Sequence, residues 1–267
     1  MRAAIKLHLV HLTASLLGVL VFSLPAVGYP YRTSFEAPGF NLGAIEGQDG
    51  WTGIGQIQDA SPSLVNRGTQ SLEISQTSTV SRSFVNGPSS GKVYIDGFYR
   101  GPTISTLPSA SSLGEGSSIL VFHDTQGIVA LNGDGVGGGT WVSSGIPVST
   151  SGLQRITICQ DYSSKTWELY IDQVLAPGGP FGFKDNSITQ FNGIDIETSD
   201  SGKGYLDDFS ATNAVPEFFD NALFDFSLEW DHETGMNETP LDWDLAPMDD
   251  KVDGRDLLEL LNRVLGQ

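Results

Sequence analysis

Apolar and polar residues alternate along two neighbouring stretches near the middle of the chain, residues 155–161 and 166–172. Successive side chains of a strand point to opposite faces, so Ile156 and Ile158 share one face of the first stretch. Trp167 begins the corresponding apolar face of the second stretch. The polar segment between the two stretches is typical of a hairpin turn. Two apolar faces joined in this way need a second layer to cover them, which favours a β-sandwich.

The same texture extends over residues 29–213, where short runs rich in Val, Ile, Phe and Tyr alternate with breaks of Gly, Ser, Asn and Pro. No long segment with a helical period interrupts them. The pattern predicts strands, besides the hairpin, near residues 32–36, 52–59, 70–75, 79–85, 92–99, 117–123, 128–131, 140–143, 190–197 and 204–212. This predicts an all-β fold, a two-sheet antiparallel jelly-roll sandwich.

The first 28 residues have the features of a signal peptide. Arg2 and Lys6 give a basic start, residues 12–24 are mostly apolar, and small residues precede an expected cleavage after Gly28. The apolar run is short for a bilayer span, which needs ~20 residues. No later stretch suggests a membrane span, so we expect a protein that is secreted or held at the cell surface.

The charge balance is strongly acidic, with 14 Lys and Arg residues against 32 Asp and Glu residues and a formal net charge of −18. Such a chain is a poor partner for nucleic acid or an anionic membrane, since both attract basic surfaces. It suits divalent cations and neutral ligands such as glycans. Cys159 is the single cysteine, so no intrachain disulfide can form, and a bound cation is an alternative cross-link.

Four short motifs occur in a recognisable order. They are Ser-Phe-Glu at residues 34–36, Gly-Gln-Asp-Gly-Trp at 47–51, Gly-Thr-Gln-Ser-Leu-Glu-Ile at 68–74 and Gly-Tyr-Leu-Asp-Asp-Phe-Ser-Ala at 204–211. With the central hairpin they resemble the concanavalin A-like (laminin-G-like) jelly-roll domains of exported proteins. The resemblance covers residues 29–213 and implies a two-sheet sandwich with glycan or protein ligands. That family includes both binding modules and hydrolases, so the fold alone does not define the chemistry.

The resemblance also implies a cation site. In related sandwiches the first and last strands are neighbours, which would bring Glu36 close to Asp207 and Asp208. Carboxylate oxygens are the ligands that Ca²⁺ prefers, so we expect a structural calcium there. Strand alternation places the two aspartates on opposite faces, and the sequence does not decide which of them would bind the ion without a bulge.

Aromatic residues are candidates for stacking against sugar rings. Trp167 lies on the apolar face of its strand and Trp51 follows a glycine turn, so both are expected to pack in the sandwich. Trp141, beside a glycine-rich stretch, is the candidate ligand-binding residue.

An enzymatic alternative rests on Glu229, Asp231 and Glu233. Their spacing matches the Glu-x-Asp-x-Glu motif of laminarinase-type glycoside hydrolases, in which one carboxylate acts as nucleophile and another as general acid. The motif follows the apparent end of the sandwich, however, and few residues remain to build a cleft around it. Catalysis by a β-glucan hydrolase is therefore the runner-up interpretation.

The C-terminal part of the chain differs in character. Residues 214–219 are predicted to be a linker, and residues 220–267 a small helical appendage in which 224–230 fits a helix or a strand equally well. Residues 242–258 resemble a degenerate dockerin (EF-hand-like) calcium loop. The resemblance implies that Asp249, Asp253 and Asp256 are its ligands. Leucine and proline occupy two other ligand positions, so residual Ca²⁺ binding and a cohesin-like partner are hypotheses.

The sequence as a whole favours an exported, non-catalytic recognition module for polysaccharide or a surface glycan. A structural or docking role through the dockerin-like segment is a further alternative.

Overall fold

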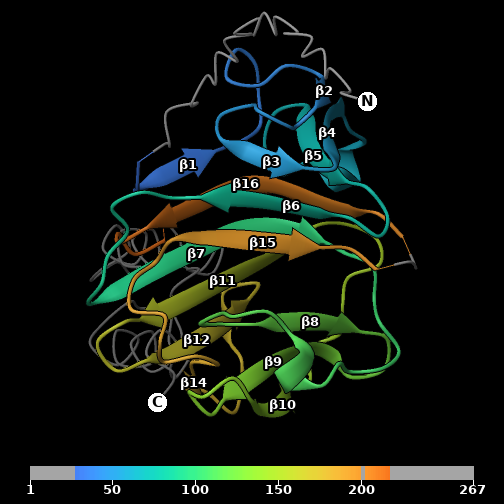
Figure 1. The fold of residues 1–267 in the computed structure, drawn as a ribbon. Coiled ribbons are helices and arrows are strands. Elements are labelled where there is room, and N and C mark those ends of the chain that lie inside the picture. The colour runs from blue at the N-terminus through green and yellow to red at the C-terminus, as the bar shows by residue number, and fades with distance from the viewer. Residues whose placement is uncertain (1–27, 200–201, 217–267) are drawn as a thin grey trace, which may run out of the picture.

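The computed structural model describes residues 28–199 and 202–216, which form an all-β fold of antiparallel strands (Figure 1). The largest sheet has ten strands in the order β13-β12-β11-β7-β16-β5-β4-β2, with β1 paired to β16 and β14 to β12. Its strands are β1 (Tyr31–Thr33), β2 (Gly43–Ala44), β4 (Gly55–Asp59), β5 (Gln70–Ile74), β7 (Lys92–Arg100), β11 (Gln154–Asp161), β12 (Thr166–Ile171), β13 (Val174–Leu175), β14 (Phe181–Gly182) and β16 (Gly204–Thr212).

Two three-stranded sheets form the second layer, in the orders β15-β6-β3 and β10-β9-β8. In Figure 1, β6 and β15 lie over β16 and β7, while β8, β9 and β10 lie near β11 and β12. The strands are β3 (Trp51–Gly53), β6 (Thr79–Ser83), β8 (Leu120–His123), β9 (Gly127–Gly133), β10 (Gly139–Ser143) and β15 (Gly193–Glu197), and two short 3₁₀ turns are η1 (Pro62–Leu64) and η2 (Ala110–Ser112). The predicted all-β antiparallel sandwich is confirmed for the described residues.

The central hairpin is confirmed in register as well as in position. Strand β11 pairs with β12 so that Ile158 lies opposite Leu169 and Gln160 opposite Trp167. On its other side β11 pairs with β7 over eight residues. The hairpin is therefore part of the middle of the large sheet, where its apolar face meets the core.

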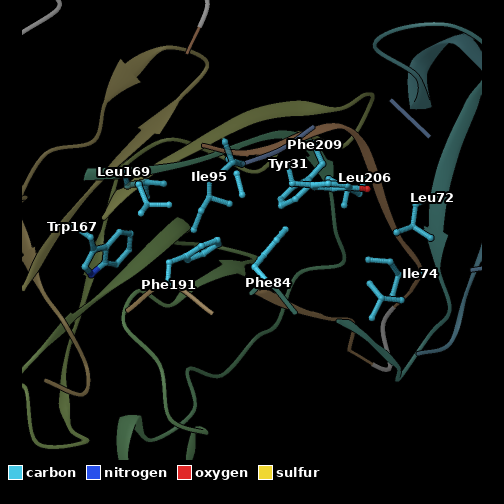
Figure 2. Packing of buried hydrophobic residues seen from close by; sticks show 14 of the residues in the cluster. Tyr31, Leu72, Ile74, Phe84, Ile95, Trp167, Leu169, Phe191, Leu206 and Phe209 are labelled. Atoms are coloured by element: carbon cyan, nitrogen blue, oxygen red, sulfur yellow. The ribbon is translucent and has the colours of Figure 1, made fainter. Parts of the chain in front are cut away.

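The core fills the space between the sheets with aliphatic and aromatic side chains (Figure 2). Trp167 is fully buried and its ring lies 4.9 Å from that of Phe181. Trp51 is also fully buried and contacts Phe35 and Phe209. Both tryptophans pack in the sandwich, as the sequence predicts.

A charged side chain, that of Arg82, lies inside this core. Arg82 on β6 is 1% exposed, and its guanidinium stacks 3.5 Å from the ring centre of Tyr31. Its Nη2 atom lies 3.6 Å from Asp49 Oδ2, which also accepts a hydrogen bond from the Tyr31 hydroxyl at 2.7 Å. Burial lowers the pKa of Arg82, while Tyr31 and Asp49 oppose that effect. The arginine thus joins β6 to β1 and to the turn before β3 through aromatic and ionic contacts.

The predicted meeting of the first and last strands is confirmed. Tyr31, Arg32 and Thr33 of β1 pair with residues 209–211 of β16. One strand prediction is wrong in detail, because residues 52–59 form two strands that belong to different sheets. Gly53 has a φ of +109°, and this turn in the backbone ends β3 before β4 begins.

Several sequence predictions lie outside the described residues. These are the signal peptide up to residue 27, the linker beyond Pro216 and the whole of the helical appendage. Among the described residues, no helix has the length and apolar character needed to cross a membrane.

Candidate functional site

The side of the large sheet that faces away from the core presents polar and aromatic groups in place of aliphatic ones. On β7, Val93 and Ile95 point into the core, so strand alternation turns Tyr94, Asp96 and Phe98 to the opposite face. Register extends this face sideways, because residues paired across neighbouring strands share a face. On β11 the partner of Asp96 is Thr157 and that of Phe98 is Arg155, while on β16 the partner of Asp96 is Ser210.

A groove of about 460 Å³ lies over this face, and we name it the β7 groove. Side chains of β1, β7, β11 and β16 line it, together with the loop before β5 and the residues that follow β16. The lining residues are Arg32, Thr33, Ser34, Asn66, Arg67, Tyr94, Asp96, Phe98, Arg155, Asp208, Phe209, Ser210, Thr212, Ala214 and Pro216. It combines aromatic rings with hydrogen-bonding groups, as binding sites for small polar ligands do.

An ion pair forms part of the groove wall. The Arg155 guanidinium donates from Nε to Asp96 Oδ1 at 3.0 Å and from Nη2 to Asp96 Oδ2 at 2.8 Å. The Thr157 hydroxyl also donates to Asp96 Oδ1. The guanidinium carbon lies 5.6 Å from the ring centre of Phe98. A two-point pair beside an aromatic ring fixes the orientation of Arg155.

Tyr94 supplies an aromatic surface at the other side of this ion pair along β7. Its side chain is half-buried. Burial is the main cause, and the neighbouring Cys159 the second cause, that raises the pKa of Tyr94 above the ordinary value for a phenol. The hydroxyl therefore stays protonated at physiological pH. The ring can offer an apolar face and a hydrogen-bond donor at the same place.

A second groove, of about 480 Å³, lies beside the turn between β8 and β9. Its lining holds a single charged side chain, Asp124, and small or polar residues such as Thr125, Gln126 and Ser143. No aromatic ring is among the described residues that line it. The β7 groove is therefore the better candidate for a site that stacks against a ring.

The three residues predicted to hold a cation surround one loop, which connects η1 to β5. Glu36 Oε1 accepts hydrogen bonds from the backbone N–H groups of Thr69 at 2.9 Å and Gln70 at 2.6 Å. Asp207 Oδ2 accepts from the N–H groups of Asn66 at 2.7 Å and Arg67 at 3.1 Å. The loop before β5 is thereby attached to both the first and the last strand regions.

Asp208 also reaches this loop, although strand alternation would turn it away. A bulge interrupts the pairing of β16 with β7 between Asp207 and Ser210, and Asp208 has a φ of +45°. Its carboxylate accepts a hydrogen bond from the Asn66 side chain and lies 3.8 Å from Arg67 Nε. Because of the bulge, both Asp207 and Asp208 reach the loop, so strand alternation does not select one of the two aspartates.

The partners that the structure gives to Glu36 and Asp207 are backbone N–H groups. Within the described parts of the chain, no three His, Cys, Asp or Glu side chains are grouped closely enough to hold a metal ion. A calcium ion at Glu36, Asp207 and Asp208 stays a prediction.

Asp207 has an unusual environment for a carboxylate, since its side chain is 0% exposed. Burial raises its pKa from 3.8 to about 6, against the opposing effect of hydrogen bonds from the N–H groups of Arg67, Asn66 and Asp208. The folded protein therefore binds this proton more tightly than the unfolded chain does. The stability that this group contributes is complete below about pH 4 and is lost as the pH rises through about 6.

We therefore expect acidification from pH 7 to pH 5 to raise the stability contributed by Asp207 by ~1 kcal/mol. Denaturant titrations at both pH values, with EDTA present, measure this change for the wild type and for Asp207→Asn, which cannot titrate. The wild type should gain more on acidification than the variant does. An equal or larger gain in the variant would contradict the environment described for this carboxylate.

The structure places Trp141 in β10, apart from both grooves. Its side chain is half-buried, and its indole N–H donates to the carbonyl oxygen of Pro108 at 2.8 Å. This contact joins β10 to the segment before η2. A role for Trp141 in ligand binding stays a prediction. The candidate catalytic residues Glu229, Asp231 and Glu233 and the loop residues Asp249, Asp253 and Asp256 lie outside the described residues.

Sequence reasoning missed the β7 groove. Tyr94, Asp96 and Phe98 alternate along one predicted strand, and this pattern is the signal from which the groove could have been predicted. Polar and aromatic residues of this kind are unusual on one face of a strand whose sheet is buried on both sides. The pairing with Arg155 depends on long-range register and has no signal in the local sequence.

Comparisons with known proteins give a likeness of shape only. The sequence matches no protein-family model and no curated protein. Among solved structures, the binding domain of Paraclostridial Mosquitocidal Protein 1 has a TM-score of 0.45 at 14% identity, covering 77% of this chain and 52% of that chain. This chain therefore spans about half the length of that protein domain.

Two further structures are similar to a lower degree. Cellulose induced protein, Cip1, has a TM-score of 0.41 at 15% identity and covers 69% of this chain and 97% of that chain. Another is the structure of domain 4 of AbnA, a GH43 extracellular arabinanase from Geobacillus stearothermophilus, in complex with arabinotriose. It has a TM-score of 0.36 at 9% identity, covering 65% of this chain and 82% of that chain. These values are too low to indicate a ligand for this chain.

Proposed function

We propose that the protein is a non-catalytic recognition module that binds a glycan in the β7 groove. The observation that carries this proposal is the row of Tyr94, Asp96 and Phe98 on the outward face of β7, lining one groove with Arg155. Sugar rings offer apolar C–H faces that stack on aromatic rings, and hydroxyl groups that bond to fixed polar groups. The groove provides both within the same wall.

The carboxylates in the groove are bound by other groups of the protein, which supports binding without catalysis. Both oxygens of Asp96 accept hydrogen bonds from Arg155, and one of them also accepts from Thr157. Asp208 accepts from Asn66 and lies near Arg67. A general acid or base needs a carboxyl group that can contact the ligand, and these contacts hold both carboxylates against groups of the protein instead.

The remaining sequence predictions belong to the same proposal. The protein acts outside the cell or at its surface, a structural Ca²⁺ strengthens the sandwich at Glu36, Asp207 and Asp208, and the C-terminal segment is an appendage with residual affinity for calcium or a cohesin-like partner. A melting curve with and without EDTA tests the calcium, since an unchanged midpoint would contradict it.

A glycan array followed by calorimetric titration of the best oligosaccharide tests the binding site. Tyr94→Ala should weaken binding by roughly 30-fold, because central aromatic residues contribute ~2 kcal/mol or more. Tyr205→Ala is the matched control, since Tyr205 lies on β16 outside the groove and bonds to Glu73. Trp141→Ala tests the alternative site on β10 that the sequence predicts.

Two results would contradict the proposal. One is an array without any glycan signal for the folded protein. The other is a loss of affinity in Trp141→Ala with none in Tyr94→Ala, which would move the site to β10.

A further inference from the structure

The charge of the β7 groove differs from that of the chain around it. Three arginines line it, namely Arg32, Arg67 and Arg155, against the two aspartates Asp96 and Asp208. The chain as a whole has 14 basic residues against 32 acidic ones. Three guanidinium groups along one groove of so acidic a protein are a local feature that composition does not explain.

The groove carboxylates are already matched to groups of the protein. Asp96 holds Arg155 through two hydrogen bonds. Asp208 bonds to Asn66, with Arg67 Nε 3.8 Å away. The two aspartates therefore fix part of the geometry of the groove.

Arg67 is well placed to meet a ligand. Its side chain is 72% exposed, whereas that of Arg155 is 16% exposed. Its backbone N–H donates to the buried carboxylate of Asp207 at 3.1 Å, so the base of this long side chain is held by the fold. A guanidinium on a fixed loop at the rim can bond to a planar anionic group through two parallel N–H groups.

We propose that the β7 groove selects glycans that carry carboxylate groups, of the uronic acid type, over neutral glycans. This inference rests on the proposed glycan-binding function. Tyr94 supplies the stacking surface for one sugar ring of the oligosaccharide, and Arg67, at the Asp207 end of the groove, bonds to the carboxylate of another ring. The acidity of the rest of the protein repels polyanions at long range, so the arginines restrict binding of such a ligand to this groove.

The test compares one oligosaccharide in two forms. Uronic acid oligomers, and the same oligomers after chemical reduction of their carboxyl groups to neutral hydroxymethyl groups, are titrated calorimetrically into the protein. The acidic form should bind about tenfold more tightly, as expected for a charge-assisted hydrogen bond to arginine. Arg67→Gln should remove most of this difference. Arg100→Gln is the matched control, because Arg100 ends β7 outside the groove.

The outcomes separate the two proposals. Equal affinity for both forms, or an unchanged preference in Arg67→Gln, overturns the selection of carboxylates while the glycan-binding function stands. If neither form binds and the glycan array shows no neutral ligand, the proposed function itself fails. Thermal melting of each variant confirms that it is folded, and Arg67→Lys, which keeps the charge, should retain part of the preference.

Discussion

Trp167→Ala should lower the free energy of unfolding by ~3–5 kcal/mol, the usual cost of removing a large buried aromatic side chain. Trp167 is fully buried, its ring lies 4.9 Å from that of Phe181, and its indole N–H donates to the carbonyl oxygen of Gly182 at 3.2 Å. The substitution leaves a cavity near the turn of the hairpin and a carbonyl oxygen without this donor. For a domain of this size the melting temperature should fall by on the order of 10 °C.

Val174→Ala is the control for this change. Val174 belongs to β13, the strand that follows the hairpin, and is 61% exposed. Its replacement should alter stability by less than ~0.5 kcal/mol, as surface substitutions usually do. Denaturant titration measures both variants. A loss below ~1 kcal/mol in Trp167→Ala would show that the hairpin does not contribute to the core as described.

Asp96→Ala should affect both stability and binding. Asp96 is 7% exposed and accepts two hydrogen bonds from Arg155. Removing one partner of a largely buried ion pair costs ~3 kcal/mol, because the charge of the other partner loses its compensation. Arg155 and the adjacent aromatic ring should then lose their fixed orientation, and glycan affinity should fall tenfold or more, which is about 1.4 kcal/mol. Denaturant titration and calorimetry measure the two effects.

The double variant Asp96→Ala/Arg155→Leu separates the two effects. Replacing both partners of a buried ion pair by apolar groups is often close to neutral, so stability should recover relative to Asp96→Ala. Binding should not recover, because the polar groups of the groove wall are gone. A double variant that binds as well as the wild type would contradict a role for this ion pair in recognition.

Local patterns were sufficient to predict much of the sandwich. The hairpin could be placed because apolar residues at a spacing of two separate a core face from an outer face, and β11 and β12 appear at the expected positions. The closing contact between β1 and β16 came from a family resemblance, not from any local pattern. The division of residues 52–59 into two strands was not predicted, because Gly53 can continue a strand or turn it and only the surrounding sheets decide.

The site was less accessible to sequence reasoning. Glu36, Asp207 and Asp208 were predicted to gather and do surround one loop, but backbone N–H groups of that loop bind Glu36 and Asp207, and backbone donors are invisible in a sequence. Asp208 reaches the loop through a bulge with positive φ. Aspartate tolerates this conformation, but an aspartate in the sequence does not predict it. The pairing of Asp96 with Arg155 joins residues far apart in the chain through strand register, which local patterns do not specify.

The most direct test of the β7 groove is an NMR titration of the isotope-labelled protein with the oligosaccharide that binds most tightly in calorimetry. We expect saturable shifts in the signals of Tyr94, Phe98 and Arg155 and of the loop that carries Arg67. Shifts confined to Gln126 and Ser143 in the second groove, or to Trp141, would contradict the account.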